Sequence, residues 1–549
     1  MAPLSLAQRE EHLEKLCGEL WDVVIIGGGI NGAGLLRDLA LRHTVDKLGL
    51  KIALIEKGHF GSGTSSKNSQ LVHGGLRYLK YLNFSLVREA LRERQTLMRI
   101  APHLVRAQPF LMPFRNRIAS WYYSAGLRAY DLLAGSHAIQ KHRRVEHRSL
   151  EEVAPRLNWR HARGAAIFYD GVMEAARLVL ENIWDAHRNG AIAVNYVDAH
   201  HLLTNREGRV VGLAVVDALS GREFEIRARL VVNAAGPWGD QLRSKMSSVR
   251  QSLRLVRGSH LIFPQLLSAE LALAFFQRDG RIVFAIPWGA NGEITLVGTT
   301  EVLHNADPDR VEMSEAEIDY LMDAVSEWLP EIRHVSPVGR YSSLRPLING
   351  EAGSLSSASR EARIWVGREG MVHIAGGKYT TYRAMASQAA KLVCKELKIH
   401  FHRNELTALH RLGTMADALW KNEEEKARLA ARYGLDAGQV NYLARLYGSR
   451  LQELLQLSNT PHALQRLHPS LPAVFAQMLF AMRYEMAASL SDFTSISTYV
   501  RYYRQWQPHE LRPLAEFMGK QLGWDENRIA QEAEAEAGRC SIAQKTFHP

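Results

Sequence analysis

The sequence WDVVIIGGGINGAG, residues Trp21–Gly34, contains the strongest structural signal in this chain. Its first part, Asp22–Ile26, is a short apolar run rich in β-branched residues, which is typical of a strand buried on both faces of a parallel sheet. Gly27, Gly29 and Gly32 follow with the G-x-G-x-x-G spacing of a dinucleotide-binding turn between a strand and a helix. Gly27 permits the tight turn, Gly29 lets a pyrophosphate approach the backbone, and Gly32 lets the helix pack on the strand.

Further strands extend this unit and suggest a long cofactor. A second apolar run, Lys51–Ile55, ends in Glu56, an acid that can hold a pair of ribose hydroxyls. Two more glycine turns follow buried strands, one at Gly236 and one at Gly376–Gly377. If all three strands share one sheet, their carboxyl ends meet at one crevice, and a ligand held at three places fits FAD better than NAD. Three unrelated turns are the open alternative.

Length and composition bound the remaining possibilities. A chain of 549 residues is too long for one core, and 46% hydrophobic with 23% charged residues is typical of a globular protein. Its three cysteines, Cys17, Cys394 and Cys540, lie far apart without C-x-x-C spacing, so we expect a reducing compartment, no disulfide framework and no metal site. The net charge of +11 calls for a negative partner: an anionic substrate, anionic lipid or nucleic acid. Nucleic acid ranks last, because no recognised binding module accompanies the charge.

The chain is expected to divide into a mixed α/β (α+β) protein with discontinuous domains. We expect a Rossmann-like FAD-binding domain interleaved with an antiparallel-sheet substrate domain, followed by an all-helical C-terminal domain. The expected bounds are 1–20 for an N-terminal helix, 21–80, 185–240 and 361–398 for the FAD-binding domain, 81–184 and 241–360 for the substrate domain, and 399–549 for the helical domain. Local patterns predict helices over 84–104, 380–397, 472–489 and 508–522, a hairpin over 281–300, and a helix through Trp328 opened by the capping box of Ser314 and Glu317.

One segment raises the question of membrane contact. Residues 111–144 mix aromatic and basic side chains, and a basic aromatic helix can lie in the plane of a membrane interface. A solvated basic helix that packs its aromatics into its own core is the equal alternative. No apolar run approaches the length of a membrane span, and residues 1–20 lack the unbroken apolar centre of a signal peptide. The expected location is therefore cytoplasmic, with contact to a membrane surface left open.

Several residues are candidates for chemistry. Lys378–Thr381 opens a helix, so its amides and hydroxyls form an anion site that would suit the pyrimidine end of a flavin; simple N-capping is the alternative. Arg77, Arg345 and Arg360 occur in segments marked by glycine, proline or serine, where a fixed guanidinium can clamp a phosphate, although each alone is more often a surface arginine. His260 becomes a candidate base only if the fold places it beside the cofactor.

With these motifs in view, the chain resembles the FAD-dependent (aerobic, respiratory) glycerol-3-phosphate dehydrogenase family. The resemblance spans about Trp21 to Leu397 and more loosely the helical C-terminal region. The motifs that carry it, in family order, are VVIIGGGINGAG, GTSS followed by LVHGGLRYL, VVNAAGPW, GSHLIF, RIVFAIPW, LVGTT, SLRPL and AGGKYTTYR. HGGLRYL together with GGKYTTYR is far more specific than the glycine fingerprint.

The resemblance implies oxidation of sn-glycerol 3-phosphate to dihydroxyacetone phosphate on FAD, with electrons passed to a membrane quinone, ubiquinone or menaquinone. It implies these FAD-binding residues: Gly27, Gly28, Gly29, Asn31, Gly32, Glu56, Thr64, Ser65, Ser66, Gly236, Gly377 and Thr380. It implies these substrate and catalytic residues: Arg77, Tyr78, Arg345 and Arg360 on the phosphate side, with His260, Lys378 and Thr380 near the reacting carbinol and the flavin. It also implies a peripheral location on the inner face of the cell membrane, and a homodimer is a further expectation.

Two departures from the family pattern and three rival functions stay open. Gln70 stands where the family usually has lysine, and the region after LSDF reads TSISTYVRYYRQW where the family usually has an arginine cluster. These departures bear on the flavin surroundings and on the docking of the C-terminal domain. The rivals are an oxygen-dependent glycerol-3-phosphate oxidase, a related FAD-dependent amine or amino-acid oxidase, and a flavin-binding protein without turnover.

Overall fold

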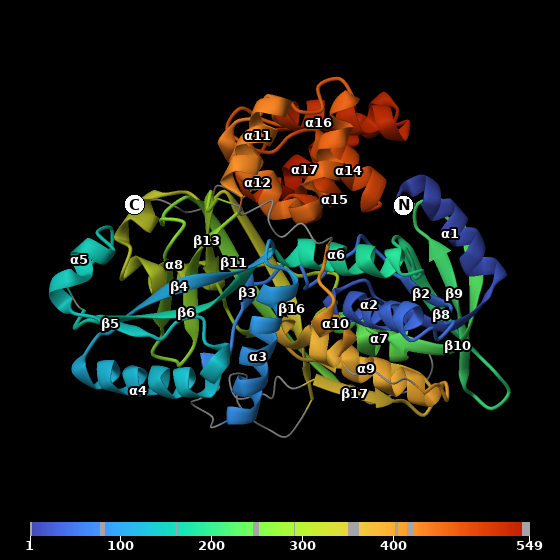
Figure 1. The fold of residues 1–549 in the computed structure, drawn as a ribbon, viewed down its shortest axis with the longest axis horizontal. Helices are drawn as coiled ribbons and strands as arrows, with labels where there is room; N and C mark the ends of the chain where they lie inside the picture. The colour runs from blue at the N-terminus through green and yellow to red at the C-terminus, as the bar shows by residue number, and fades with distance from the viewer. Residues whose placement is uncertain are drawn as a thin grey trace.

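The computed structural model describes residues 3–76, 83–160, 162–244, 252–289, 291–349, 362–400, 405–413 and 422–540. Two sheets lie side by side, with a block of C-terminal helices packed over them (Figure 1). This arrangement confirms the expected mixed α/β class with a helical C-terminal domain.

The first sheet is the dinucleotide-binding sheet, and β1 lies near its centre. β1 pairs in parallel with β2 and β10, and β10 pairs in parallel with β18. Its eight described strands are β1 (Leu20–Ile26), β2 (Ile52–Ile55), β7 (Ile192–Val194), β8 (Val197–Thr204), β9 (Val210–Asp217), β10 (Glu223–Asn233), β17 (Ala362–Val366) and β18 (Val372–Gly376). Because β1, β10 and β18 run the same way, the three glycine turns expected from the sequence lie at one end of this sheet.

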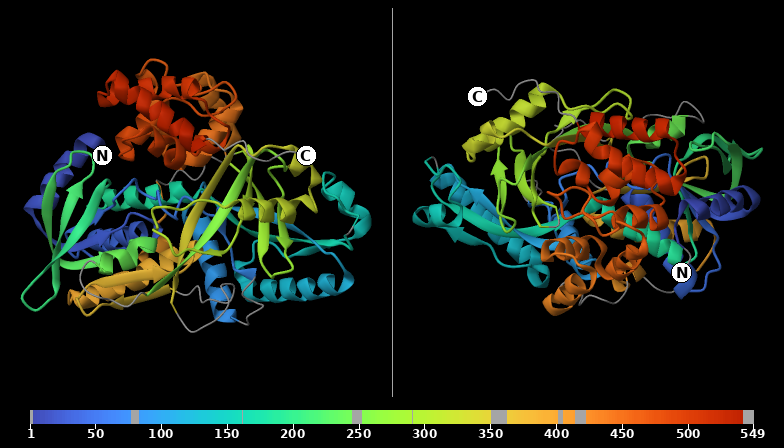
Figure 2. Two further views of the ribbon diagram at one scale, coloured as in Figure 1. Left: turned by 180° about the vertical axis from the view of Figure 1, so that it is seen from behind. Right: turned by 90° about the horizontal axis from the view of Figure 1, so that it is seen from above.

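Both faces of this sheet are covered, as the apolar run of β1 requires. Alternate residues of a strand point to opposite faces. Val23 and Ile25 pack in the core cluster that holds residues of the helices α2 (Ile30–Val45), α6 (Ala175–Arg188) and α9 (Tyr382–Glu396). Val24 and Ile26 pack with residues of α1 (Leu6–Gly18) and the β8–β9 hairpin. Figure 2 shows α1, the blue helix beside the N-terminus, on the outer edge of the molecule.

The second sheet is largely antiparallel and forms the substrate side of the molecule. Among the described residues it contains β3 (Leu71–Val72), β4 (Val105–Pro113), β5 (Arg143–Val145), β6 (Ala165–Met173), β11 (Leu253–Pro264), β12 (Ala272–Phe276), β13 (Ile282–Trp288), β14 (Ile294–Gly298), β15 (Val302–Leu303) and β16 (Gly339–Ile348). Its one parallel pair among the pairs described is β4 with β12. The expected hairpin is confirmed by the antiparallel pairing of β13 with β14.

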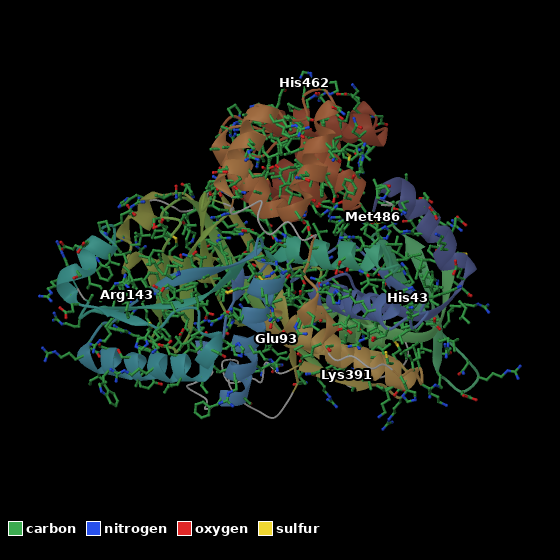
Figure 3. The ribbon with its side chains drawn as sticks, viewed as in Figure 1. His43, Glu93, Arg143, Lys391, His462 and Met486 are labelled. Carbon is green, nitrogen blue, oxygen red and sulfur yellow. The ribbon has the colours of Figure 1, made fainter. Side chains whose placement is uncertain are left out.

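Helices within the first 409 residues cover the sheets. They are α1 (Leu6–Gly18), α2 (Ile30–Val45), α3 (Phe84–Ile100), α4 (Arg117–Ala134), α5 (Leu150–Val153), α6 (Ala175–Arg188), α7 (Gly239–Ser244), α8 (Glu315–Ser326), α9 (Tyr382–Glu396) and α10 (Leu406–Leu409). The capping box of Ser314 and Glu317 opens α8 as expected, and the helix ends two residues before Trp328. In Figure 3, Glu93 of α3 lies where that helix meets α9, and its carboxylate accepts two hydrogen bonds from Arg383 at 2.6 and 2.7 Å.

The basic aromatic segment 111–144 is shorter as a helix than its composition suggested. Its first residues end β4, α4 occupies Arg117–Ala134, and β5 follows. The expected boundary between the FAD-binding and substrate domains at 184/185 falls inside α6, which packs on α2. The division into domains stays a prediction.

The C-terminal block consists of α11 (Glu423–Tyr433), α12 (Ala437–Tyr447), α13 (Leu451–Leu455), α14 (Ala476–Tyr484), α15 (Leu490–Asp492), α16 (Pro508–Leu522) and α17 (Glu526–Cys540). The helix expected over 472–489 is shorter, whereas 508–522 matches α16. Tyr499 and Tyr502 dock this block by packing on Trp288 of β13, with ring centroids 4.9 and 5.7 Å apart. Arg501 is instead buried in an ion pair with Glu536. Docking combines these aromatic contacts with buried polar ones, such as the ion pair of Arg177 in α6 (Ala175–Arg188) with Glu485.

Candidate active site

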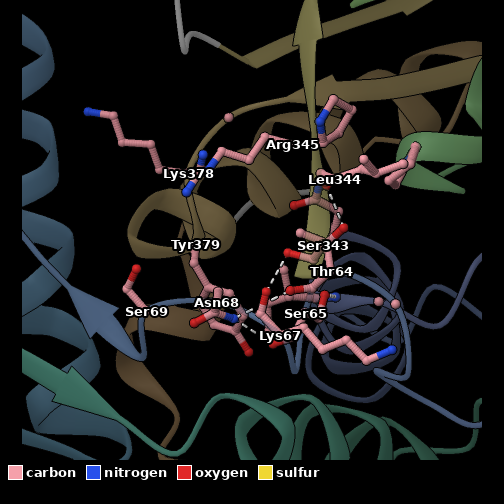
Figure 4. Close-up of a pocket in the computed structure, with 18 of the residues that line it drawn as sticks. Thr64, Ser65, Lys67, Asn68, Ser69, Ser343, Leu344, Arg345, Lys378 and Tyr379 are labelled. Carbon is pink, nitrogen blue, oxygen red and sulfur yellow. Dashed lines mark hydrogen bonds between the residues drawn. The ribbon is translucent and has the colours of Figure 1, made fainter. Parts of the chain in front are cut away.

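The described residues enclose one large cavity between the two sheets. It has a volume of about 810 Å³, toward the upper end of the ~300–1,000 Å³ usual for small-molecule sites. Its wall includes the ends of β1, β10 and β18 on one side and residues of β11, β13 and β16 on the other. The 61–70 loop crosses between them, and Figure 4 shows part of this loop with residues of β16 and the segment before α9.

The glycine turn has the close contacts that its spacing predicts. Gly27 has φ +107°, and a Cβ on Gly32 would overlap the carbonyl oxygen of Gly27. Gly29 and Asn31 line the cavity at the start of α2, where amides and the helix dipole favour an anion. The amide of Ile30 donates to Ser65 Oγ at 2.9 Å, which ties α2 to the 61–70 loop.

Glu56 follows β2 and lines the same cavity. Its carboxylate accepts hydrogen bonds from the amides of Gly28 at 2.6 Å and Gly58 at 2.8 Å. Burial raises the pKa of Glu56, and these two amides oppose that shift. The carboxylate is thereby fixed at the cavity wall, in the place expected for a ribose-binding acid.

The three hydroxyl residues of the 61–70 loop have different partners. Thr64 lines the cavity and donates to the carbonyl of Leu344 at 2.6 Å, which joins the loop to β16. Ser65 also lines the cavity and accepts the Ile30 amide. Ser66 is buried and donates to the carbonyl of Gly63 at 3.4 Å. All three hydroxyls thus stabilise the loop itself.

The turns after β10 and β18 complete the cofactor side. Gly236 and Gly377 both line the cavity and have positive φ, +55° and +83°. Lys378 lines the cavity beside them, immediately before η6 (Tyr379–Thr381) and α9. Thr380 Oγ1 accepts from the amide of His73 at 3.1 Å and lies 3.3 Å from its carbonyl oxygen, so it holds the histidine–glycine turn against the start of α9.

His260 lies on β11 in the cavity wall, as the base hypothesis requires. Its Nε2 is 2.8 Å from Ser69 Oγ, and its ring packs on Tyr341 with centroids 4.9 Å apart. A Cβ on Gly298 would overlap the imidazole, so the neighbouring strand β14 must carry glycine there. Burial, helped by the charge of Arg345, lowers the pKa of His260 to about 3, which keeps the ring neutral at physiological pH.

Arg345 lies on β16 and lines the cavity near His260. Its guanidinium donates to Thr299 Oγ1 at 2.8 Å and to the Thr300 carbonyl at 3.2 Å. A Cβ on Gly258 would come within 2.5 Å of it, so the guanidinium is packed against the backbone of β11. Lys378 lines the same cavity, and Figure 4 labels both residues. Three other predicted residues, Arg77, Tyr78 and Arg360, lie outside the described residues.

Sequence reasoning missed two residues of this site. Ser69 was not singled out, although the hydroxyl-rich run around it was the available signal. Tyr341 was also missed, and its hydroxyl donates to the Asn68 carbonyl at 2.5 Å. Its role depends on strand pairing, since β11 and β16 place Tyr341 opposite His260.

The residues present fit FAD. A helix N-terminus for a diphosphate, a fixed carboxylate for a ribose, and the glycine turns at Gly236 and Gly377 all face one cavity. The fold and the cavity are therefore those of a dinucleotide-binding flavoprotein.

Comparison with known proteins agrees and is more specific. Residues 22–392 match the model of the FAD dependent oxidoreductase family, and residues 409–529 match the C-terminal domain of alpha-glycerophosphate oxidase. Glycerol-3-phosphate dehydrogenase 2 of Mycobacterium bovis is 33% identical over 99% of this chain and 93% of its own length. The aerobic glycerol-3-phosphate dehydrogenase of Staphylococcus saprophyticus is 31% identical over 89% of this chain and 88% of its own. The structure of the glycerol-3-phosphate dehydrogenase of Bacillus halodurans complexed with FAD superimposes with a TM-score of 0.78 at 27% identity, covering 98% and 97% of the two chains.

The chain belongs to the FAD-dependent glycerol-3-phosphate dehydrogenase family, and its cofactor is FAD.

Proposed function

We propose that this enzyme oxidises sn-glycerol 3-phosphate to dihydroxyacetone phosphate and passes the electrons to a membrane quinone, ubiquinone or menaquinone. The observation that carries the proposal is the placement of His260 and Arg345 in the wall of the same cavity as the dinucleotide-binding turn. The substrates named for the relatives support it.

Each side of the cavity has a proposed role. The start of α2 binds the diphosphate, Glu56 binds the adenosine ribose, and the amides around Gly377 and Thr380 face the pyrimidine end of the flavin. Bound FAD supplies the acceptor for the hydride that leaves the C2 carbon of the substrate. Arg77, Tyr78 and Arg360 are proposed for the substrate from the resemblance alone.

Arg345 and His260 are proposed to act together. Arg345 neutralises the substrate phosphate and fixes the carbinol, the positioning on which an oriented reaction depends. Burial is the main cause of the low pKa of His260, and the charge of Arg345 is the second. A phosphate dianion beside Arg345 offsets that second contribution, so substrate binding makes the histidine a better base. Lys378 is a second cation facing the same cavity and is proposed to assist.

The membrane part of the proposal depends on α4. Four large apolar side chains stand on its outer face: Ile118 and Leu132 are 82% exposed, Trp121 is 77% exposed and Tyr122 is 53% exposed. Arg117 and Arg128 of the same helix, and Arg143 and Arg144 of β5, supply exposed positive charge. Apolar side chains rimmed by arginines favour an interface with anionic lipid. We place this contact at the inner face of the cell membrane.

The rest of the fold is compatible with peripheral contact. No helix in the described ranges is both long and apolar enough to cross a bilayer. In Figures 1 and 2, α4 and the C-terminal helices lie at opposite edges of the molecule, so α4 can face lipid while those helices face away from it. A homodimer stays a prediction.

An anaerobic absorbance titration with glycerol 3-phosphate tests the proposal. The flavin absorbance band should bleach fully when one equivalent of substrate has been added, and it should return when a short-chain quinone is added. A purified yellow protein that glycerol 3-phosphate does not bleach would exclude the activity. Bleaching by an amino acid alone would identify an amine or amino-acid oxidase.

An oxygen-dependent oxidase is the second candidate, because residues 409–529 match a domain model named for alpha-glycerophosphate oxidase. Rapid return of the absorbance band in air with an equivalent of peroxide, and slow return with quinone, would favour it. The membrane surface of α4 would then need another explanation.

A further inference from the structure

We infer that Ser69 is the proton relay between the substrate carbinol and His260, so that the histidine works through a serine hydroxyl. This inference rests on the proposed oxidation of glycerol 3-phosphate and adds to it a residue that neither the motifs nor the relatives singled out.

The first observation is that His260 is almost closed off from the cavity. The residue lines the cavity but is only 1% exposed, and three neighbours lie against its ring. Tyr341 packs against the imidazole ring, the backbone at Gly298 lies close to the ring edge, and the Ser69 hydroxyl is within hydrogen-bond distance of Nε2. A carbinol in the cavity therefore cannot reach Nε2 without displacing the Ser69 hydroxyl.

The second observation is that Ser69 stands between the ring and the cavity. Ser69 is half-buried and lines the cavity, and its hydroxyl is 2.8 Å from His260 Nε2. In Figure 4 its side chain points away from Lys67, toward the side on which Lys378 lies. A serine hydroxyl can accept one proton while it donates another, which is the property that a relay needs.

The protonation state of the imidazole allows this direction of transfer. The neutral ring has one nitrogen with a lone pair, and Ser69 can donate to it at Nε2. Nδ1 is buried without a hydrogen-bond partner among the described residues, so none of the described carboxylates orients the ring as in a serine-protease triad. The position of the ring instead depends on Tyr341 and Gly298, and its access to protons depends on Ser69.

In the proposed step the carbinol loses a proton and a hydride together. The carbinol O–H gives its proton to Ser69 Oγ, while the Ser69 proton moves to His260 Nε2 and leaves an imidazolium. The C2–H bond breaks at the same time, its electron pair leaves with the hydrogen as hydride to bound FAD, and the carbinol becomes a ketone. Two electrons and two hydrogens leave the substrate, and the serine returns to its starting state.

Two variants at Ser69 of the holoenzyme test the relay in the anaerobic reaction with glycerol 3-phosphate. Ser69→Ala should slow bleaching of the flavin about 100-fold, the usual contribution of a positioned base. Flavin content per chain and the substrate concentration at half-saturation should stay within about twofold, since Ser69 binds neither group tightly. Ser69→Thr keeps a hydroxyl and should recover most of the rate.

The double variant separates a relay from two independent effects. If Ser69 acts only through His260, Ser69→Ala should cost nothing more in a His260→Ala background, because residues that work as a unit are not additive. The matched control is Ser470→Ala. It removes a second serine–imidazole hydrogen bond of 2.8 Å, between Ser470 and His468 in the C-terminal block, and should leave every rate unchanged.

The outcomes are distinct. Wild-type bleaching in Ser69→Ala, or additive losses in the double variant, would overturn the relay and leave the proposed function intact. A loss of flavin content in Ser69→Ala would also overturn it, since the serine would then serve the cofactor. A wild-type enzyme that glycerol 3-phosphate does not bleach would overturn the proposed function and the relay together.

Discussion

Gln70 and Ala175 are joined by a buried hydrogen bond: the amide of Ala175, the first residue of α6, donates to Gln70 Oε1 at 3.0 Å. Gln70 Nε2 also donates a hydrogen bond to the Ser66 carbonyl at 3.0 Å. The residue is 1% exposed and has φ +54°. It therefore ties the 61–70 loop to α6. These two hydrogen bonds are the role that Gln70 has at the position where the family usually has lysine.

Replacing Gln70 by lysine should destabilise this chain, although lysine is the usual family residue. Lysine has no acceptor for the Ala175 amide, and a buried N–H left unpaired costs about 1–3 kcal/mol. The measurement is the unfolding free energy of the holoenzyme in urea. Gln452→Lys, on the exposed side of α13, is the control and should change stability by less than about 0.5 kcal/mol. Equal stability of the two variants would show that lysine finds its own partners here.

Glu56→Gln should weaken FAD binding. The carboxylate accepts two backbone amides and faces the cavity, and the amide that replaces it presents a donor where an acceptor is needed. A charged hydrogen bond contributes about 1.5–3 kcal/mol, so affinity should fall about 10- to 150-fold. Fluorescence titration of the apoprotein with FAD measures this. The control is Glu146→Gln, which changes an exposed ion pair with Arg148 and should bind FAD as the wild type does. If Glu56→Gln also binds FAD with wild-type affinity, Glu56 does not bind the cofactor.

The sequence predicted the cofactor side of the site better than the substrate side, for a physical reason. Gly27, Gly32 and Glu56 act through local geometry, a turn and the end of a strand, so their spacing in the chain carries the information. Tyr341 meets His260 only through the pairing of β11 with β16, and no local pattern encodes that register. Thr64, which is expected to hold FAD, lines the cavity, and its hydroxyl donates to the Leu344 carbonyl, a contact that only the folded chain creates.

Arg345→Gln should raise KM for glycerol 3-phosphate more than it lowers kcat. The guanidinium is held by Thr299 and Thr300, so its charge is fixed where a phosphate can be clamped. Loss of a charged contact of about 1.5–3 kcal/mol corresponds to a rise of about 10- to 150-fold. Steady-state kinetics with a soluble dye acceptor give both constants. Arg227→Gln, at a side chain 77% exposed on β10, should match the wild type, and an unchanged KM in Arg345→Gln would contradict the clamp.

Membrane binding should depend on the outer face of α4. The double variant Ile118→Ser with Trp121→Ser removes two exposed apolar side chains, each contributing about 1.5–3 kcal/mol when buried in lipid. Flotation with vesicles containing anionic lipid should show at least about a tenfold loss of bound protein, with bleaching by substrate retained. Leu219→Ser, at an exposed leucine after β9, is the control. Full flotation of the double variant would place the lipid contact elsewhere.

Acid should destabilise the protein through its buried neutral histidines, and His103 offers the clearest test. Burial, with the charge of Arg177, lowers the pKa of His103 to about 3, against about 6.5 in an unfolded chain. The unfolded state therefore binds one more proton between these pKa values, so the stability that this histidine contributes is complete above about pH 6.5 and is lost as the pH falls toward 3. The slope is about 1.4 kcal/mol per pH unit. The unfolding free energy, measured in urea from pH 7.5 to pH 5, should depend less steeply on pH in His103→Gln than in the wild type. In His200→Gln, whose side chain is 50% exposed, the pH dependence should match the wild type. Because His103 packs against Gly448 of the C-terminal block, equal slopes in wild type and His103→Gln would mean that this contact opens before the histidine titrates.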